Sequence, residues 1–178
     1  MPITGHVFIA TSLDGFIARP DGTLDWLISR SAPEEDHGYT TFIAGMDCIL
    51  MGRGTYEAVL GFPDWPYTLP VLVLSKSLAG QPAPDALRDK VSFADLTPQQ
   101  AMQRLATQGH RRAYIDGGQI VQSFLRAGLI ADMTITTAPV LIGQGRPLFG
   151  TLPQDIALVH QATTAFPSGL VQSRWRVA

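Results

Sequence analysis

Short apolar runs alternate with helical patterns along most of the chain, and strand-like segments close it. Runs of four to eight apolar residues between turn signals are typical of buried strands. Such runs predict strands at 47–51 and 71–74, shorter apolar segments predict strands at 91–93 and 113–115, and a partly alternating segment predicts one at 3–10. Apolar residues at helical spacing, or helix start and stop signals, predict helices at 33–44, 52–60, 97–109 and 120–125.

The last third of the chain contains a different pattern. Residues 132–138 alternate between apolar and polar, as a half-buried strand does. Two more strands are expected at 156–165 and 170–177, with Pro167-Ser-Gly169 as the hairpin turn between them. Together these patterns predict an α/β domain with a mostly parallel central sheet, flanking helices and a C-terminal antiparallel hairpin.

Two of the expected strands lead into a helix through glycine. Gly52 follows the 47–51 strand, and Gly117 and Gly118 follow the 113–115 strand. Glycine lets the backbone approach a ligand closely, and the first N–H groups of a helix have no partner within it. Each corner therefore suits a phosphate or pyrophosphate. A single Gly-Gly pair between a strand and a helix is more often a tight turn without a ligand.

Segment 11–26 carries two strong turn signals, Asp14-Gly15 and Asp21-Gly22. We expect an irregular, mobile loop here. Long loops inside compact domains are uncommon and usually functional, so its length indicates a lid or binding segment.

Composition favours one soluble domain over residues 1–178, since 46% of the residues are hydrophobic and no compositional break occurs. Lys and Arg number 13 against 15 acidic residues, so a nucleic-acid partner is not expected. The single Cys48 and four scattered histidines have no metal-ligand spacing. No segment resembles a leader or membrane span, and we expect a cytoplasmic protein with no membrane partner.

The common catalytic fingerprints are absent. Gly52-Arg-Gly54 has Glu57 where a dinucleotide fingerprint needs its third glycine, and no Walker, nucleophile-elbow or zinc-deaminase motif occurs. What remains is two glycine-started helices, Arg53, and Ser75-Lys76 at a strand end. Ligands of open α/β sheets bind beyond the carboxyl ends of the strands, so these groups fit a dinucleotide. Arg53 and Lys76 favour NADP over NAD, although each alone could be an ordinary surface charge.

Five motifs in this order resemble the dihydrofolate reductase-like superfamily, and in particular the C-terminal reductase domain of the bifunctional riboflavin-biosynthesis deaminase-reductase. The resemblance spans nearly the whole chain. Its motifs are Ser12-Leu-Asp-Gly-Phe-Ile-Ala18, Met51-Gly-Arg-Gly-Thr-Tyr-Glu57, Val73-Leu-Ser-Lys76, Asp116-Gly-Gly-Gln119 and Pro139-Val-Leu-Ile-Gly-Gln-Gly-Arg-Pro-Leu-Phe149.

The resemblance implies a dihydrofolate reductase-like fold that binds NADPH. On the adenosine side the implied residues are Gly52, Arg53 and Thr55 at phosphate, and Ser75 and Lys76 at the 2′-phosphate. Those implied at the pyrophosphate are Gly117, Gly118, Gln119, Ile120 and Val121. Ala10, Ile17 and Ala18 are implied around the nicotinamide, beneath a lid formed by residues 14–26.

Asp36 and Asp14 are the expected catalytic carboxylates. Asp36 lies where dihydrofolate reductases carry the acid that hydrogen-bonds the pterin, which implies a partly buried carboxylate with a raised pKa. Equally, it could be an ordinary acid in the first turn of the 33–44 helix. Asp116 departs from the pattern, because an acid beside Gly117-Gly118 would repel a pyrophosphate unless it points away or caps the helix.

The leading interpretation is an NADPH-dependent reductase that transfers hydride to a C=N or C=O of a pteridine- or pyrimidine-like substrate. It resembles the 5-amino-6-(5-phosphoribosylamino)uracil reductase of riboflavin biosynthesis. The alternatives are a dihydrofolate reductase and a non-catalytic NADP-binding module. The resemblance also implies a homodimer.

Overall fold

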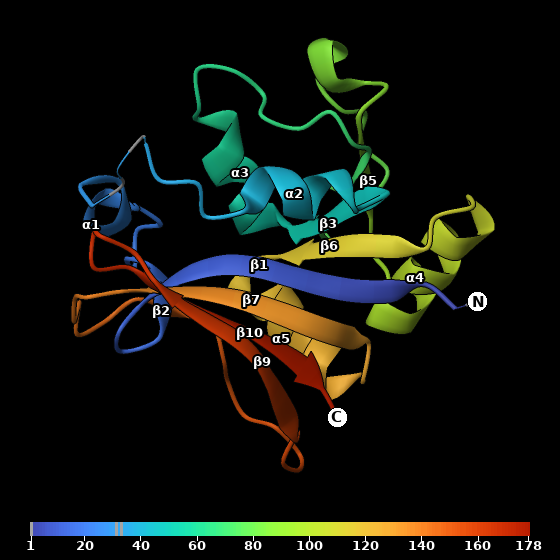
Figure 1. Ribbon diagram of the computed structural model, residues 1–178. Helices are drawn as coiled ribbons and strands as arrows, with labels where there is room; N and C mark the ends of the chain where they lie inside the picture. The colour runs from blue at the N-terminus through green and yellow to red at the C-terminus, as the bar shows by residue number, and fades with distance from the viewer. Residues whose placement is uncertain (1, 31, 33) are drawn as a thin grey trace.

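The computed structural model describes residues 2–30, 32 and 34–178. Its centre is an eight-stranded sheet in the order β5-β4-β3-β6-β1-β7-β10-β9 (Figure 1). The strands are β1 Thr4–Ser12, β3 Cys48–Gly52, β4 Val71–Leu74, β5 Val91–Ala94, β6 Arg112–Asp116, β7 Ile130–Ala138, β9 Leu158–Ala165 and β10 Val171–Val177. From β5 to β7 all neighbours are parallel, whereas β10 pairs antiparallel with both β7 and β9. The predicted fold class and hairpin are confirmed.

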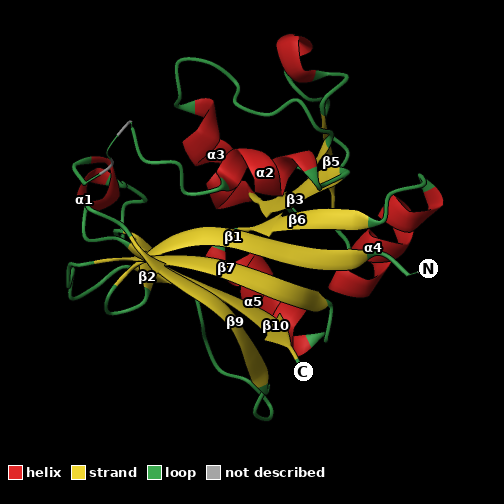
Figure 2. Cartoon of the chain, in the orientation of Figure 1, coloured by secondary structure: helices red, strands yellow, loops and turns green. Residues whose placement is uncertain are grey.

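Helices cover both faces of this sheet, as Figure 2 shows. One face packs against α4 Pro98–Thr107 and α5 Gly118–Arg126, which bury Met102, Phe124 and other apolar residues with Leu50 and Ile115. The opposite face packs against α2 Tyr39–Ala44 and α3 Arg53–Leu60. The strands are therefore apolar on both faces, as buried parallel strands need to be.

The parallel strands bring their carboxyl ends to one edge of the sheet. Met51 pairs with Asp116, and Gly52 pairs with Leu74, so β3, β4 and β6 finish almost level. The starts of α3 and α5 and the turn after β4 consequently lie side by side.

Two local predictions from the sequence, the helix cap at Thr97 and the buried Cys48, are confirmed. The expected cap at Thr97 is a full capping box, in which Thr97 Oγ1 accepts from the N–H of Gln100 and Gln100 Oε1 accepts from the N–H of Thr97. Cys48 is fully buried in the core. Among the described residues, no helix is both long enough and apolar enough to cross a membrane.

The helix predicted at 33–44 is much shorter in the structure. It spans only Tyr39–Ala44, because Gly38 before it has a φ of 80°, which no helix residue adopts. Residue 33 of the predicted helix lies outside the described residues. Glu34 to Gly38 belong to a connecting segment, so Asp36 is not on a helix.

The irregular loop predicted at 11–26 is also wrong in part. It includes the end of β1, the short strand β2 Phe16–Ala18 and the start of α1 Asp25–Ile28. β2 pairs with β8 Arg146–Pro147 in a separate two-stranded sheet. A bidentate pair between Arg19 and Asp25, at 2.6 and 2.9 Å, closes the turn that follows β2. A short 3₁₀ helix, Asp85–Leu87, precedes β5.

Candidate functional site

The starts of α3 and α5 form a single corner at the edge of the sheet. Gly52 is the N-cap of α3 and Gly117 that of α5, and neither helix has a side-chain cap bond. A Cβ built on Gly117 would lie 2.5 Å from Thr55 Oγ1, and one on Gly52 would lie 3.0 Å from Ile120 Cγ1. The structure therefore brings together Gly52, Thr55, Gly117 and Ile120, which the sequence had assigned to two separate corners.

Glycine is required at both positions of the Gly117-Gly118 pair. Gly117 has a φ of 93°, which strains any residue with a side chain. A Cβ on Gly118 would lie 2.4 Å from the carbonyl oxygen of Pro147 and 3.2 Å from Ile17 Cδ1. Atoms of Thr55, Pro147 and Ile17 therefore pack directly against these two glycines. The two helix starts favour negative charge at the same place.

A basic corner adjoins these helix starts. Arg53 Nη1 donates to the Ser77 hydroxyl at 3.1 Å, so α3 is tied to the turn that follows β4. Ser75 Oγ lies 3.2 Å from Ser77 Oγ and accepts from the N–H of Leu78, while Lys76 is exposed. The predicted 2′-phosphate residues Arg53, Ser75 and Lys76 thus lie around one turn.

Arg146 is a cation at this edge that the sequence reading missed. It lies on β8, and its Nε donates to the carbonyl of Pro20 at 3.4 Å. Its guanidinium is 3.2 Å from the Cβ position of Gly22 and 3.3 Å from that of Gly54, so it joins the 19–23 turn to the first turn of α3. The motif containing Arg146 was recognised, but only the tertiary pairing of β8 with β2 puts its side chain here.

Two of the three residues expected around the nicotinamide, Ile17 and Ala18, lie beside this corner on β2. Ala10 is half-buried near the end of β1, and Ile17 on β2 packs against Gly118. Ala18 is buried and pairs with Arg146. Part of the segment predicted to form a lid is therefore held in the small sheet of β2 and β8.

Val121 and Gln119 differ in what they can offer a ligand. Gln119 is exposed on the first turn of α5. Val121 is fully buried in the core, and its N–H donates to the carbonyl of Gly117 at 2.9 Å. The predicted contact of Val121 with a cofactor is wrong, because neither its side chain nor its N–H is available.

The carboxyl of Asp116 stands out by its burial and its raised pKa. Its side chain lies on the face of Tyr114, opposite the face covered by α5, because residues two apart on a strand share a face. Its Oδ1 accepts from the N–H of Gly117 at 2.8 Å. Burial raises the pKa of Asp116 to about 6, and the bond from the N–H of Gly117 opposes that rise. The carboxyl thus points away from α5.

Aromatic rings surround this carboxyl. Phe8, Tyr39, Phe42 and Tyr114, hereafter the aromatic cluster, have ring centroids 5.0 to 6.4 Å apart. The Tyr114 hydroxyl donates to the carbonyl of Phe8 at 2.9 Å. Burial, and then the charge of Asp116, raise the pKa of Tyr39 to about 12 and also raise the pKa of Tyr67. Tyr67 therefore lies close enough to feel the same carboxyl.

The two carboxylates predicted to be catalytic have other surroundings. Asp36 is exposed, and its Oδ1 accepts from the N–H of Gly38 at 2.7 Å, which forms the turn before α2. The expectation of a partly buried acid on a helix is wrong, because the short α2 leaves Asp36 in the connection. No contact joins Asp36 to Asp116 among those of the described residues.

Asp14 connects two backbone segments. Its carboxylate accepts from the Ser12 hydroxyl at 2.6 Å and from the N–H groups of Ile142 and Gly143 at 3.1 and 2.7 Å. The Ser12 bond, followed by those backbone N–H groups, lowers the pKa of Asp14. In the structure Asp14 therefore positions the turn after β1, and its catalytic role stays a prediction.

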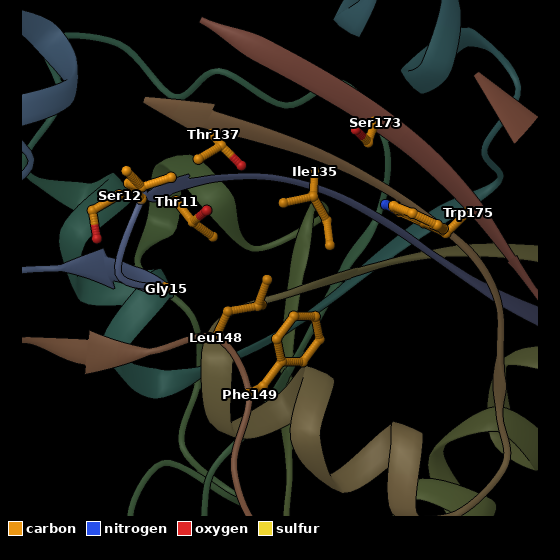
Figure 3. Close-up of a pocket in the computed structure, with 10 residues that line it drawn as sticks. Thr11, Ser12, Gly15, Ile135, Thr137, Leu148, Phe149, Ser173 and Trp175 are labelled. Carbon is orange, nitrogen blue, oxygen red and sulfur yellow. The ribbon is translucent and has the colours of Figure 1, made fainter. Parts of the chain in front are cut away.

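A cavity of about 260 Å³ lies elsewhere on the molecule (Figure 3). Leu148 and Phe149 form one side of it, and Ile135, Thr137 and Trp175 lie on the strands opposite. These strand residues alternate with Thr136 and Gln172, so the cavity opens on the face away from Asp116. It is separate from the corner formed by α3 and α5.

These features define a dihydrofolate reductase-like α/β domain with two glycine-started helices at one edge of its sheet and a half-buried acid beside them. Comparison with known proteins gives the family. The model of the RibD C-terminal domain family matches residues 4–172, so the chain belongs to that family. This membership supports an oxidoreductase of the riboflavin-pathway reductase type.

Three relatives illustrate the range of similarity. The uncharacterised protein YwjB of Bacillus subtilis is 33% identical over 163 residues, which cover 90% of each chain. The crystal structure of a protein from Shewanella sp. PV-4, named for riboflavin biosynthesis, matches 99% of both chains with 38% identity and a TM-score of 0.92. A Thermotoga maritima diaminohydroxyphosphoribosylaminopyrimidine deaminase/5-amino-6-(5-phosphoribosylamino)uracil reductase has the same fold, with 12% identity, a TM-score of 0.76, and coverage of 99% of this chain and 57% of that one.

Proposed function

We propose that this protein is an NADPH-dependent reductase that transfers hydride to a C=N or C=O group of a pteridine- or pyrimidine-like heterocycle. The observation that carries the proposal is the contact between the two glycine-started helices, in which Gly117 meets Thr55 and Gly52 meets Ile120. Two helix starts that meet at one corner provide neighbouring N–H groups for both phosphates of a dinucleotide. Family membership supports the same class of reaction.

The residues present fit such a cofactor. Gly52, Thr55, Gly117 and Gly118 would hold the pyrophosphate, because the free N–H groups at the starts of α3 and α5 lie at this corner and neither helix has a side-chain cap. Arg53, Ser75 and Lys76 would hold a 2′-phosphate, since charge-assisted bonds to phosphate are about twice as strong as neutral ones. When bound, NADPH supplies a hydride at its nicotinamide ring.

Asp116 supplies the second requirement of the reaction. Reduction of C=N adds a hydride to carbon and a proton to nitrogen. With a pKa of about 6, Asp116 is partly protonated near neutrality and can donate that proton, then regain one from solvent. Ala10 and Phe8 lie on the same face of β1. The parallel register of β1 and β6 pairs His6 with Tyr114, and two residues further it sets Phe8 opposite Asp116. The expected nicotinamide position therefore adjoins the acid.

The small β2–β8 sheet would exclude water from this place. Arg146 ties it to α3, and Asp14 ties the turn after β1 to Ile142 and Gly143. Excluding water strengthens every electrostatic interaction in the site and prevents loss of the hydride to side reactions.

The test is a titration with NADPH followed by a screen of reducible pteridines, pyrimidines and aldehydes, with loss of NADPH absorbance as the readout. Oxidation that depends on a heterocycle supports the proposal. Binding without oxidation by any of them would favour the non-catalytic module, and strong inhibition by an antifolate would favour a dihydrofolate reductase.

We also propose that the protein pairs as a homodimer through the β9–β10 hairpin. β9 is the edge strand of the sheet, and Leu158, Val159 and Val171 on the hairpin are exposed. Unpaired edge strands with exposed apolar side chains are sites of association. Analytical ultracentrifugation of the protein and of a Val159→Lys variant tests this, since the variant should sediment as a monomer.

A further inference from the structure

The cavity of Figure 3 lies outside the proposed reductase site. Side chains of β1, β7 and β10 form one side of it, and Leu148 and Phe149, which follow β8, form the other. Thr11, which lines the cavity, and Phe8 are three residues apart on β1, so they point to opposite faces of the sheet. The cavity and the aromatic cluster are therefore separated by the sheet itself.

Apolar side chains and two aromatic rings make up much of the lining. Ile135 and Leu148 lie beside the rings of Phe149 and Trp175 (Figure 3). Rings of this kind attract other flat rings, either stacked or edge to face. An apolar cavity of about 150 Å³ holds one benzene molecule. At about 260 Å³, this cavity has room for one substituted ring or two fused rings.

Two hydroxyls without a partner lie toward the other end of the cavity. Thr11 and Thr137 are cross-strand partners, whereas Trp175 pairs with Met133, four residues before Thr137. Thr11 is only 5% exposed, yet no hydrogen bond joins its hydroxyl, or that of Thr137, to any described residue. The indole N–H of Trp175 has no partner there either. A buried hydroxyl that lacks a partner costs free energy, and each of these groups can donate to a ligand.

The lining carries no charge. The residues around the cavity include no Asp, Glu, Lys, Arg or His. Asp14 adjoins Gly15 of the lining, but its carboxylate already accepts from the Ser12 hydroxyl and from two backbone N–H groups. A charged ligand would lose its hydration here and gain no ion pair in return. Apolar walls with a few placed polar groups are typical of sites for small neutral molecules.

We propose that this cavity binds an uncharged, flat aromatic molecule of one or two fused rings. Its rings lie against Phe149 and Trp175, and an acceptor atom at its other end accepts from the hydroxyls of Thr11 and Thr137. Because the cavity is separate from the corner of α3 and α5 and from Asp116, this site does not rest on the proposed reductase function.

The experiment titrates the full chain with quinoline near neutral pH, where this two-ring molecule is uncharged and carries one acceptor nitrogen. Proton–nitrogen correlation spectra follow the indole N–H signals of the three tryptophans, of which only Trp175 lines the cavity. We expect the Trp175 signal to shift and saturate while those of Trp26 and Trp65 stay in place. N-methylquinolinium and quinoline-4-carboxylate, the charged counterparts, should bind at least about tenfold more weakly.

Two variants examine the ring and the hydroxyl separately. Phe149→Ala should raise the Kd of quinoline about tenfold, because it removes one ring-on-ring contact. Phe62→Ala is the matched control, since Phe62 is 47% exposed against 46% for Phe149 but does not line the cavity. Thr137→Val keeps the shape of the side chain and should raise Kd about fivefold, the usual effect of one neutral hydrogen bond. Circular dichroism shows whether each variant is folded.

Several results would overturn the proposal. They are the lack of a saturable shift of Trp175, tighter binding of a charged probe, and equal effects of Phe149→Ala and Phe62→Ala. A shift of Trp65 in place of Trp175 would put quinoline near Tyr67, whose ring contacts Trp65, and would also overturn it. Displacement of quinoline by NADP⁺ would mean that the cavity belongs to the cofactor site. Failure of NADP⁺ to bind would contradict the proposed function and leave this site standing.

Discussion

Two regions lie at the same edge of the sheet: the glycine corner at α3 and α5, and the aromatic cluster beside Asp116. They differ in whether backbone or side chains form them. The corner is made of backbone, with Gly52, Gly117 and Gly118 in close contact and cations around it. The cluster is made of side chains that come from β1, β6 and α2, around one acid. A site made of backbone N–H groups suits the phosphate groups that many ligands have in common. A site made of side chains can select one particular ring.

The largest effect should come from Asp116→Asn, which removes the acid and keeps its shape. Loss of a positioned proton donor costs about 100-fold or more in turnover. The Kd for NADPH should not change, because the carboxyl points away from α5. Stopped-flow reduction and equilibrium titration measure the two quantities. Equal loss of turnover and cofactor affinity would mean that the corner and the cluster are one site.

Next in size is Gly118→Ala, which breaks the corner alone. Its Cβ would lie 2.4 Å from the Pro147 oxygen, so overpacking should lower the free energy of unfolding by about 1–3 kcal/mol. NADPH affinity should fall at least tenfold, or about 1.4 kcal/mol, because β8 must shift. Gly45→Ala is the control, with its nearest neighbour at an ordinary 3.4 Å. Similar behaviour of the two variants in denaturant melts and NADPH titrations would argue against a required glycine at 118.

Replacing Arg53 and Lys76 together by Ala should reduce the preference for NADPH over NADH about tenfold, the effect of losing charge-assisted bonds to one phosphate. NADH binding should change little. The ratio of the two dissociation constants is the measurement. A ratio that stays constant places the 2′-phosphate elsewhere, with Arg146 as the next cation to replace.

A smaller effect concerns pH and stability. Because the pKa of Asp116 is raised to about 6, the native state holds a proton that the unfolded chain loses near pH 4. Its contribution to stability is therefore full at low pH and is lost as pH rises through about 6, by roughly 1–3 kcal/mol. Asp116→Asn lacks this proton, so the variant should gain stability relative to the wild type above pH 6. Urea unfolding of both proteins from pH 4 to 8 tests the sign, and a constant difference would contradict the raised pKa.

Asp36→Asn should have the smallest effect, less than about twofold on turnover, as surface substitutions usually do. Asp36 is exposed and bonds only to the N–H of Gly38 among the described contacts. Steady-state kinetics of this variant beside Asp116→Asn would show which acid belongs to the reaction. A large loss at position 36 would restore the assignment implied by the resemblance.

The sequence predicted the backbone site far better than the side-chain site. Strand, glycine and helix follow one another directly in the chain, so the order alone indicated Gly52 and Gly117-Gly118, and parallel strands bring their ends to one edge. Ser75 was indicated by its place at a strand end, whereas Thr55 was implied only by the resemblance. Arg146 was missed because its position depends on the pairing of β8 with β2, which no local pattern specifies.

Asp116 shows why the acid could not be identified from local patterns. Beside Gly117 it resembled an obstacle to pyrophosphate, and only the alternation of side chains on β6 places it on the face of Tyr114. The role of Asp36 came from the resemblance, and its placement on a helix came from the 33–44 pattern. Because Gly38 has a φ of 80°, the helix begins only after it. α2 therefore has six residues, Tyr39–Ala44, and does not include Asp36.

The most direct test of the central claim is amide hydrogen exchange with and without NADPH. One dinucleotide held between α3 and α5 should slow exchange at 52–55 and 117–119 together, with the same dependence on NADPH concentration. Protection of only one of these segments, or of neither, would contradict a single cofactor site at this edge of the sheet.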